Sequence, residues 1–312
     1  MTRQKKMLVD TDAGVDDILA LFILLQSVPA SKIDVAVTYG NVPLDQAVSN
    51  VSLLSLISGL APDQLLRGSS APLFGEPSFA TDVHGLDGLG GVTSSPPWLP
   101  PIIRPCADLA GARGDQYDRI IALGPMTNMA RLGSPSIDQL PLFIMGGAFE
   151  AGGNVTPHAE FNFHSDPAAA DAVFQRHLGE IFVVPLDVCN TVILGRKYLS
   201  DLCAGNPART PTFLNLIHQH YMDFYLRSEG IDGCHPHDAL AVCAALNQDL
   251  FTWVRGWIRV LPDGPERGRS LFRPDPNGRH YAARSVDASR FFNILESAIT
   301  DFTEPAAPKL QP

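Results

Sequence analysis

Four aspartates lie close together near the start of the chain, at Asp10, Asp12, Asp16 and Asp17. Carboxylates at this spacing repel one another, and a partly buried carboxylate is costly without a partner. A hard divalent cation would relieve the repulsion, and Ca²⁺ takes about six to eight oxygen ligands. The residues themselves therefore point to a cation site with acid–base chemistry.

Helix capping offers a simpler explanation for part of this cluster. Asp16 or Asp17 could cap the helix that follows, because acidic side chains favour helix N-termini. Capping accounts for only one or two of the four aspartates. An EF-hand loop is excluded because its glycine and its distant glutamate would stand at other positions. We therefore favour a functional acid cluster.

The cluster stands where a predicted strand turns into a predicted helix. Residues 7–9 are typical of the end of a buried strand, Gly14 allows a tight turn, and apolar residues then recur at helical spacing from 18 to 25. Further strands are predicted at 33–39, 65–66, 119–123, 142–145 and 181–185, a β pair at 251–260 and 280–286, and helices at 43–58, 210–228, 237–246 and 287–299, with another opening at Asp166-Pro167. This alternation predicts an α/β fold with a mainly parallel central sheet, flanked by helices in a Rossmann-like open arrangement.

Polar residues and glycines follow the ends of several predicted strands. Asn41 follows the second strand, Gly124 a later one, and Asp187 the strand that ends near residue 185. In open α/β sheets, ligands bind outside the carboxyl ends of the strands. We therefore expect these residues to meet the acid cluster at one edge of the sheet.

Composition excludes several classes of protein. The 312 residues carry a formal net charge of −10, whereas a nucleic-acid-binding protein is expected to show a basic patch. No apolar run reaches the roughly 18 residues of a membrane span. The five cysteines are never paired at short spacing, which indicates neither a disulfide framework nor a zinc site. A cytoplasmic location follows as the default.

The chain reads as a single domain over residues 1–312. Residues 68–101 are rich in Gly, Pro and Ser and show little periodicity, and a long irregular segment within a compact chain is usually functional or disordered. We expect it to be an active-site loop, with His84 near its tip. The proline-rich tail, 303–312, is expected to be frayed.

Four segments together resemble the nucleoside hydrolases, the family of inosine–uridine-preferring and pyrimidine-specific ribonucleoside hydrolases. They are residues 10–17 (DTDAGVDD), 124–128 (GPMTN), 153–162 (GNVTPHAEFN) and 237–241 (HDALA), in the family's order. The usual proline after the second aspartate is Ala13 here, and the Asp-Pro-Glu that often follows the third motif is Asp-Pro-Ala. Neither difference removes a functional group. The resemblance implies hydrolysis of the N-glycosidic bond of ribonucleosides to ribose and free base.

The resemblance also implies a Ca²⁺ site. Its ligands would be Asp12, Asp17, the main-chain carbonyl of Leu123 and Asp238, all of them hard oxygen donors. Asp12 would be the general base toward a metal-activated water, and Asp10 would steady the turn. Glycosidases usually employ two carboxylates, and here the metal-held water would replace one of that pair.

The ribose and the base would each have their own residues. By resemblance, the ribose hydroxyls would be bound by carboxylates and amides, which complement hydroxyl groups: Asp16, Asn41, Asn154, Glu160 and Asn162. Met145 either faces the sugar or the base, or packs in the core. His237 would be the general acid for the departing base, and His84 would close over it. Tyr221 and Tyr225, one helical turn apart, would line the base pocket with Phe161 or form an aromatic core stripe.

Two other functions are weighed against this one. An aspartate-nucleophile phosphohydrolase would need a Thr or Ser and a downstream Lys beside the acids, and neither is convincingly placed. A non-catalytic nucleoside-binding protein would be expected to have lost Asp12 or His237, and both are present. The expected partner is a small nucleoside, with no nucleic acid and no membrane. Relatives form homo-oligomers, dimers or tetramers. His237 leans toward inosine and uridine, but the base preference stays open.

Overall fold

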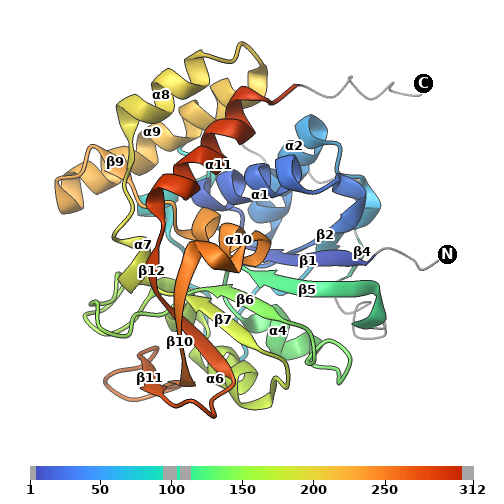
Figure 1. Ribbon diagram of the computed structural model, residues 1–312, viewed down its shortest axis with the longest axis vertical. Coiled ribbons are helices and arrows are strands. Elements are labelled where there is room, and N and C mark those ends of the chain that lie inside the picture. Colours follow the sequence, from blue (N-terminus) through green and yellow to red (C-terminus); the bar gives the residue numbers. More distant parts are fainter. Residues whose placement is uncertain (1–4, 94–103, 106–113, 304–312) are drawn as a thin grey trace.

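A large sheet, covered by helices on both faces, organises the computed structural model, which describes residues 5–93, 104–105 and 114–303 (Figure 1). Within these residues the strand order is β11-β10-β12-β7-β6-β5-β1-β2-β3-β4. The strands are β1 (Lys6–Thr11), β2 (Ile33–Val37), β3 (Leu65–Arg67), β4 (Arg104–Pro105), β5 (Tyr117–Ala122), β6 (Leu142–Met145), β7 (Ile181–Val184), β10 (Phe251–Val260), β11 (Ser270–Pro274) and β12 (His280–Val286). A separate pair joins β8 (Leu194–Gly195) to β9 (Gly233–Cys234).

The sheet is parallel from β4 to β12, and β10 runs antiparallel to both of its neighbours, β12 and β11. Strand β1 lies between β2 and β5, with Val9 opposite Val35 and Asp10 opposite Ala122. The predicted fold class is therefore confirmed. Strand β11 was not predicted, because its half-exposed sequence lacks a clear alternation of apolar residues.

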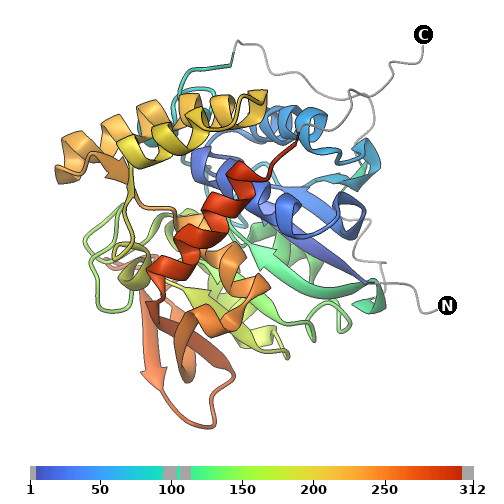
Figure 2. The same cartoon turned by 45° about the horizontal axis from the view of Figure 1, so that its top comes forward.

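The helices lie in two layers, one on each face of the sheet (Figure 2). They are α1 (Val15–Ser27), α2 (Leu44–Ser58), α3 (Thr81–His84), α4 (Thr127–Leu132), α5 (Phe161–Ser165), α6 (Pro167–Arg176), α7 (Leu186–Cys189), α8 (Arg196–Ala204), α9 (Arg209–Glu229), α10 (His237–Leu246) and α11 (Ala288–Thr300). Helix α9 begins at Arg209, with Ala208 in the N-cap position, one residue before the predicted start at 210.

Successive residues of β1 enter different cores, as expected for a strand covered on both faces. Val9 joins the larger core, beneath α1, α2, α10 and α11, whereas Leu8 joins the smaller core against α4 and α6. Helix α1 is buried from Val15 to Leu24, which explains why it is apolar on nearly all sides. It packs directly against α10. This contact brings together the two helices that carry Asp17 and Asp238.

Parallel strands place their carboxyl ends at one edge of the sheet. The segments after β1, β2, β5 and β6 therefore carry residues 12–17, Asn41, Leu123 and Glu160 to the same region. Residues 94–101 of the expected active-site loop and 304–312 of the expected tail lie outside the described residues. None of the described helices combines the length and hydrophobicity that a membrane crossing requires.

Candidate active site

The turn between β1 and α1 is held by hydrogen bonds among its own residues. The Thr11 hydroxyl donates to Asp17 Oδ1 at 2.5 Å and accepts from the Ala13 amide at 3.2 Å. The Gly14 amide donates to Asp17 Oδ2 at 2.8 Å. Asp17 thus closes the first turn of α1, as the capping explanation expects, while its carboxylate also faces the other acids. Ala13 has a φ of +56°, in the left-handed region.

Asn41, from the segment after β2, joins the two halves of the turn. Its amide N–H donates to Asp12 Oδ2 at 2.8 Å, and its side-chain Nδ2 donates to Asp12 Oδ1 and to Asp17 Oδ2, each at 3.1 Å. This close approach depends on glycine. A Cβ on Gly40 would meet Asp12 Oδ2, and a Cβ on Gly14 would meet the Asn41 side chain. Asn41, which the sequence predicts to bind ribose, therefore also orients Asp12.

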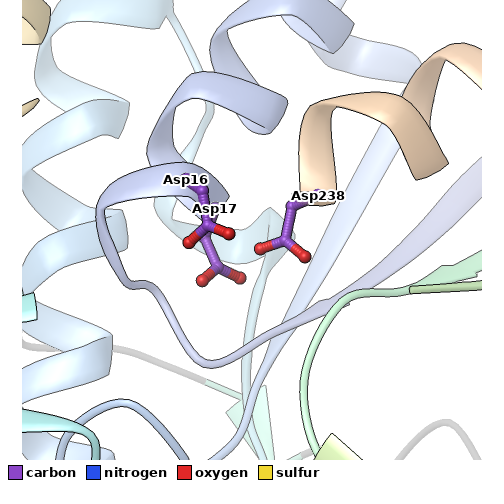
Figure 3. A group of neighbouring side chains, drawn as sticks. All are labelled: Asp16, Asp17 and Asp238. Atoms are coloured by element: carbon purple, nitrogen blue, oxygen red, sulfur yellow. The ribbon is translucent and has the colours of Figure 1, made fainter. Parts of the chain in front are cut away.

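Three carboxylates form a compact group at the start of α1 and α10. One oxygen from each of Asp16, Asp17 and Asp238 lies within 4.8 Å of the others, and Figure 3 shows them converging from the two helices. The predicted ligand set contains Asp12 rather than Asp16. In the structure Asp12 lies beside Asp17, but outside this group. The Leu123 carbonyl accepts from Asn162 Nδ2 at 2.7 Å, which leaves its second lone pair available.

The acids are buried, and none of the described residues that line the adjoining cavity offers a Lys or Arg to compensate their charge. Burial, together with the charge of Asp17, raises the pKa of Asp10 and of Asp16 to about 8. Burial and the neighbouring acids likewise raise the pKa values of Asp12 and Asp238 well above the usual range. Such shifts arise when several negative charges share one dry site.

A bound cation fits this site. None of the described residues that line the adjoining cavity is a Lys or an Arg. Asp16 Oδ1 is buried and has no hydrogen-bond partner among the described residues, and the same holds for Asp10 Oδ2, whose Oδ1 accepts from Asn128 Nδ2 at 2.6 Å. A divalent ion with oxygen ligands would remove the repulsion and satisfy Asp16.

A cavity of about 590 Å³ opens above the acids. It is lined by every predicted substrate-binding residue: Asp16, Asn41, His84, Met145, Asn154, Glu160, Phe161, Asn162, Tyr221 and Tyr225. His237, Leu123 and Asp238 line it too, whereas Asp12 and Asp17 do not. Met145, Tyr221 and Tyr225 both line the cavity and belong to the core cluster, so their packing in the core does not remove them from the cavity.

Near β6, two of the predicted ribose-binding residues, Glu160 and Asn154, form part of the cavity wall and are held by backbone hydrogen bonds. Glu160 caps α5 by accepting from the amides of Asn162 and Phe163, and it accepts from the Gly147 amide at 2.8 Å. Asn154 Oδ1 accepts from the Phe161 amide at 2.9 Å. Burial raises the pKa of Glu160, although these amides oppose the shift. The wall therefore presents pre-oriented polar groups.

At the opposite side, two histidines and two tyrosines form a connected aromatic wall. The His84 ring stacks on Tyr221 with centroids 5.0 Å apart, and His84 Nδ1 accepts from the Val15 amide at 3.1 Å. The Tyr225 hydroxyl lies 2.8 Å from His237 Nε2. Burial lowers the pKa of both His84 and His237 to about 3, with smaller contributions from neighbouring histidines, so both rings are neutral.

Sequence reasoning missed the outer rim of the cavity. Phe79, Asp82, Phe224 and Glu229 line it there. Phe224 could have been found from its neighbour Tyr225, and Glu229 from its position one helical turn further along α9. Phe79 and Asp82 carry no such signal, because they lie in the aperiodic segment before His84.

Comparison with known proteins is consistent with this geometry. Residues 7–293 match the family model described as inosine-uridine preferring nucleoside hydrolase. The chain is 33% identical to uridine nucleosidase 1 of Arabidopsis thaliana over 279 residues, covering 86% of this chain and 82% of the relative. It is 34% identical to the non-specific ribonucleoside hydrolase RihC of Escherichia coli over 267 residues, covering 82% and 84%.

Solved structures show the same architecture. A plant nucleoside hydrolase, the PpNRh1 enzyme, matches with a TM-score of 0.84 at 30% identity, covering 95% of this chain and 99% of that chain. A purine-preferring ribonucleoside hydrolase from Gardnerella vaginalis matches with a TM-score of 0.84 at 28% identity, covering 95% and 98%. The named relatives thus differ in the bases that their names specify.

Proposed function

The chain belongs to the inosine-uridine preferring nucleoside hydrolase family, and from that premise we propose that it hydrolyses ribonucleosides to ribose and free base with the help of a bound Ca²⁺. Membership confirms the resemblance found in the sequence. It also establishes the chain as an enzyme that acts on N-glycosyl bonds, so the phosphohydrolase and binding-protein alternatives are set aside.

One observation carries the calcium proposal: a buried group of acids, unmatched by Lys or Arg, adjoins the cavity that the predicted substrate residues line. We assign the ion to Asp12, Asp17, Asp238 and the Leu123 carbonyl, with Asp16 close enough to contribute. When bound, Ca²⁺ would supply Lewis-acid chemistry, lowering the pKa of water and offsetting the charge of the carboxylates.

Asp12 is the proposed general base. Its carboxylate is 1% exposed and both its oxygens accept from Asn41, so its orientation is fixed before substrate arrives. Asp12 would take the proton of the attacking water. The neighbouring acids would also stabilise the positive charge that develops on the ribose ring in an oxocarbenium-like transition state.

The residues of the cavity wall would bind the ribose. Hydroxyl groups both donate and accept, and the proposed partners offer carboxylate and amide groups along the cavity wall. They are Asp16, Asn41, Asn154, Glu160 and Asn162. Because Glu160 and Asn154 already accept backbone hydrogen bonds, ribose binding would require little rearrangement of them.

His237 is the proposed general acid for the departing base. Its imidazole is neutral in the free enzyme, and negative charge on the departing base would favour its protonated form. Solvent would supply the proton that His237 passes on, and the Tyr225 hydroxyl, whose pKa burial raises well above its usual value, would orient the ring through its contact with Nε2. His84 and Tyr221, stacked together, would contact the base, with Phe161 on the cavity wall.

The decisive experiment measures reducing sugar released from inosine, uridine, cytidine and adenosine, with the protein first treated with EGTA and then resupplied with Ca²⁺ or Mg²⁺. We expect ribose release from uridine and inosine that EGTA abolishes and Ca²⁺ restores. Ribose release that resists EGTA, after metal analysis confirms that the protein holds no calcium, would overturn the metal assignment. Absence of ribose release from every nucleoside would overturn the substrate class.

The remaining expectations from the sequence stand as proposals. We propose a single domain over residues 1–312, with 68–101 as an active-site loop, that assembles as a cytoplasmic homo-oligomer, either a dimer or a tetramer. Light scattering on the purified chain tests the assembly, and a monomer would contradict it.

A further inference from the structure

The segment that follows His84 is closed on itself by one carboxylate. Asp87 is 5% exposed, and its Oδ1 accepts from the amides of Leu89 at 2.9 Å and Gly91 at 2.8 Å. Its Oδ2 accepts from the amide and the hydroxyl of Thr93, at 2.8 and 2.7 Å. These bonds hold the pKa of the Asp87 carboxyl below its usual value, against the opposing effect of burial. Residues 84–93, which we call the His84 loop, are therefore held in a defined conformation by hydrogen bonds to the Asp87 carboxylate.

Glycines allow this loop to approach its neighbours closely. Gly88 and Gly90 have φ values of +74° and +71°, a region that side chains disfavour. A Cβ on Gly88 would lie 2.9 Å from Asn50 Nδ2, and one on Gly90 would lie 2.7 Å from the Ile217 carbonyl. The loop is thus pressed between α2, which carries Asn50, and α9.

Asn50 links this loop to the acid turn. Its Nδ2 donates to the Asp87 carbonyl at 2.8 Å and to the Ala13 carbonyl at 3.1 Å, while its Oδ1 accepts from Gln46 Nε2 at 3.0 Å. The side chain is 1% exposed, so both N–H groups are committed to these carbonyls. Ala13 follows the proposed general base, and Asp87 lies three residues after His84.

We propose that Asn50 is a positioning residue that holds the His84 loop at a fixed distance from the acid turn, residues 11–17. With this spacing, His84 would contact the base of a nucleoside while Asp12 activates the water that attacks the same molecule. The inference rests on the proposed function for the roles of Asp12 and His84. The acid turn keeps its own bonds through Thr11 and Asn41 when Asn50 is removed. The loop keeps its internal bonds, the bonds of the His84 and Gly85 amides to the first turn of α3, the Val15 amide bond to His84 and the stacking of His84 on Tyr221. Its later part, around Asp87, loses its hydrogen bond to α2. Loss of Asn50 therefore loosens the loop more than the turn.

The test compares Asn50→Ala and Asn50→Asp with Gln46→Ala, which removes a neighbour of Asn50 but keeps both of its N–H bonds. Two substrates separate the effects: a nucleoside that the wild type cleaves, and p-nitrophenyl β-D-ribofuranoside, whose leaving group needs no protonation. Hydrogen exchange of peptides covering residues 84–93 reports the loop without relying on activity. Thermal unfolding of each variant shows whether it is folded at the assay temperature.

We expect both Asn50 variants to lose about tenfold or more in kcat on the nucleoside while changing little on the p-nitrophenyl riboside, because the contacts of His84 with the departing base are impaired and the p-nitrophenyl riboside carries no nucleobase. Amides of residues 84–93 should exchange faster, and Gln46→Ala should match the wild type in every assay. Equal losses on both substrates, or unchanged exchange in the loop, would overturn the proposal. Should the wild type cleave no nucleoside, the proposed function fails, and the exchange result still decides whether Asn50 holds the loop.

Discussion

Asp12 is oriented by two hydrogen bonds from Asn41, one to each of its carboxylate oxygens. Asp12→Asn keeps an oxygen for the Asn41 amide but removes the basic carboxylate. We expect kcat to fall by about 10²- to 10⁴-fold, the range for loss of a general base, with the fold retained. Steady-state kinetics on uridine or inosine and circular dichroism provide the measurement.

The control for this substitution is Asp34→Asn. Asp34 is also buried, but it lies on β2, where it pairs with Lys6 at 2.7 Å and accepts from the Tyr117 hydroxyl. Removing its charge should change stability rather than kcat. If Asp12→Asn retained near-wild-type turnover, another residue would have to be the base.

Ala13 stands where the family usually has proline, and its backbone shows that the difference matters. A proline ring fixes φ near −65°, whereas Ala13 has a φ of +56° and donates its N–H to Thr11. We expect Ala13→Pro to lose most activity and to unfold at lower temperature, because the turn that presents Asp12 must change. Ala13→Gly, which adopts this φ without cost, should keep wild-type activity and controls for loss of the methyl group. A fully active Ala13→Pro would mean that the turn has a negative φ at this position.

At the scale of elements, the periodicity of the sequence predicted most strands and helices because each buries an apolar face. The strand at 142–145 and the helix at 237–246 match β6 and α10 in the structure. The alignment of parallel strands then explains why all the predicted substrate residues reach one cavity. The carboxylate group itself depends on a tertiary contact. Asp16 and Asp17 are neighbours in the sequence, but Asp238 reaches them only because α10 packs against α1, which no local pattern reveals.

Helix α9 carries a buried histidine that makes the stability of the fold depend on pH. His218 is fully buried on this helix, and its Nδ1 lies 2.7 Å from the Leu214 carbonyl. Burial lowers its pKa from 6.5 to about 4. Above pH 6.5 neither state binds the proton, so the contribution of His218 to stability is complete. As the pH falls from 6.5 toward 4, the unfolded chain takes up the proton first and stability is lost, by up to about 3 kcal/mol.

Replacing His218 with Phe should remove this part of the acid sensitivity. The free energy of unfolding in urea, measured at pH 7 and pH 5, should fall less in His218→Phe than in the wild type. The buried acids titrate in both proteins, so their effect cancels in the comparison. His158→Phe, at an exposed histidine, is the matched control and should behave as wild type. Identical losses in all three proteins would show that His218 is not buried as a neutral ring.

At the scale of the whole molecule, the acid cluster joins distant parts of the chain. Asp17 comes from the first helix and Asp238 from α10, and both are buried against one another with raised pKa values. In the absence of a cation, this repulsion opposes the packing of α1 on α10. A cation that binds only the folded state stabilises it by mass action, by about 2.7 kcal/mol at a concentration 100 times Kd.

We therefore expect saturating Ca²⁺ to raise the Tm of EGTA-treated protein by about 5 °C or more. The same addition should leave Asp238→Asn almost unchanged, because that variant loses a proposed ligand and one of the clustered charges. Asp238→Asn without calcium should in turn be more stable than calcium-free wild type, since part of the repulsion is gone. Differential scanning calorimetry of both proteins, with Mg²⁺ as a second ion, measures all of these effects. The proposal would be contradicted if Ca²⁺ did not change the wild-type Tm and Asp238→Asn were less stable than calcium-free wild type. These results would show that repulsion among the acids does not destabilise the fold.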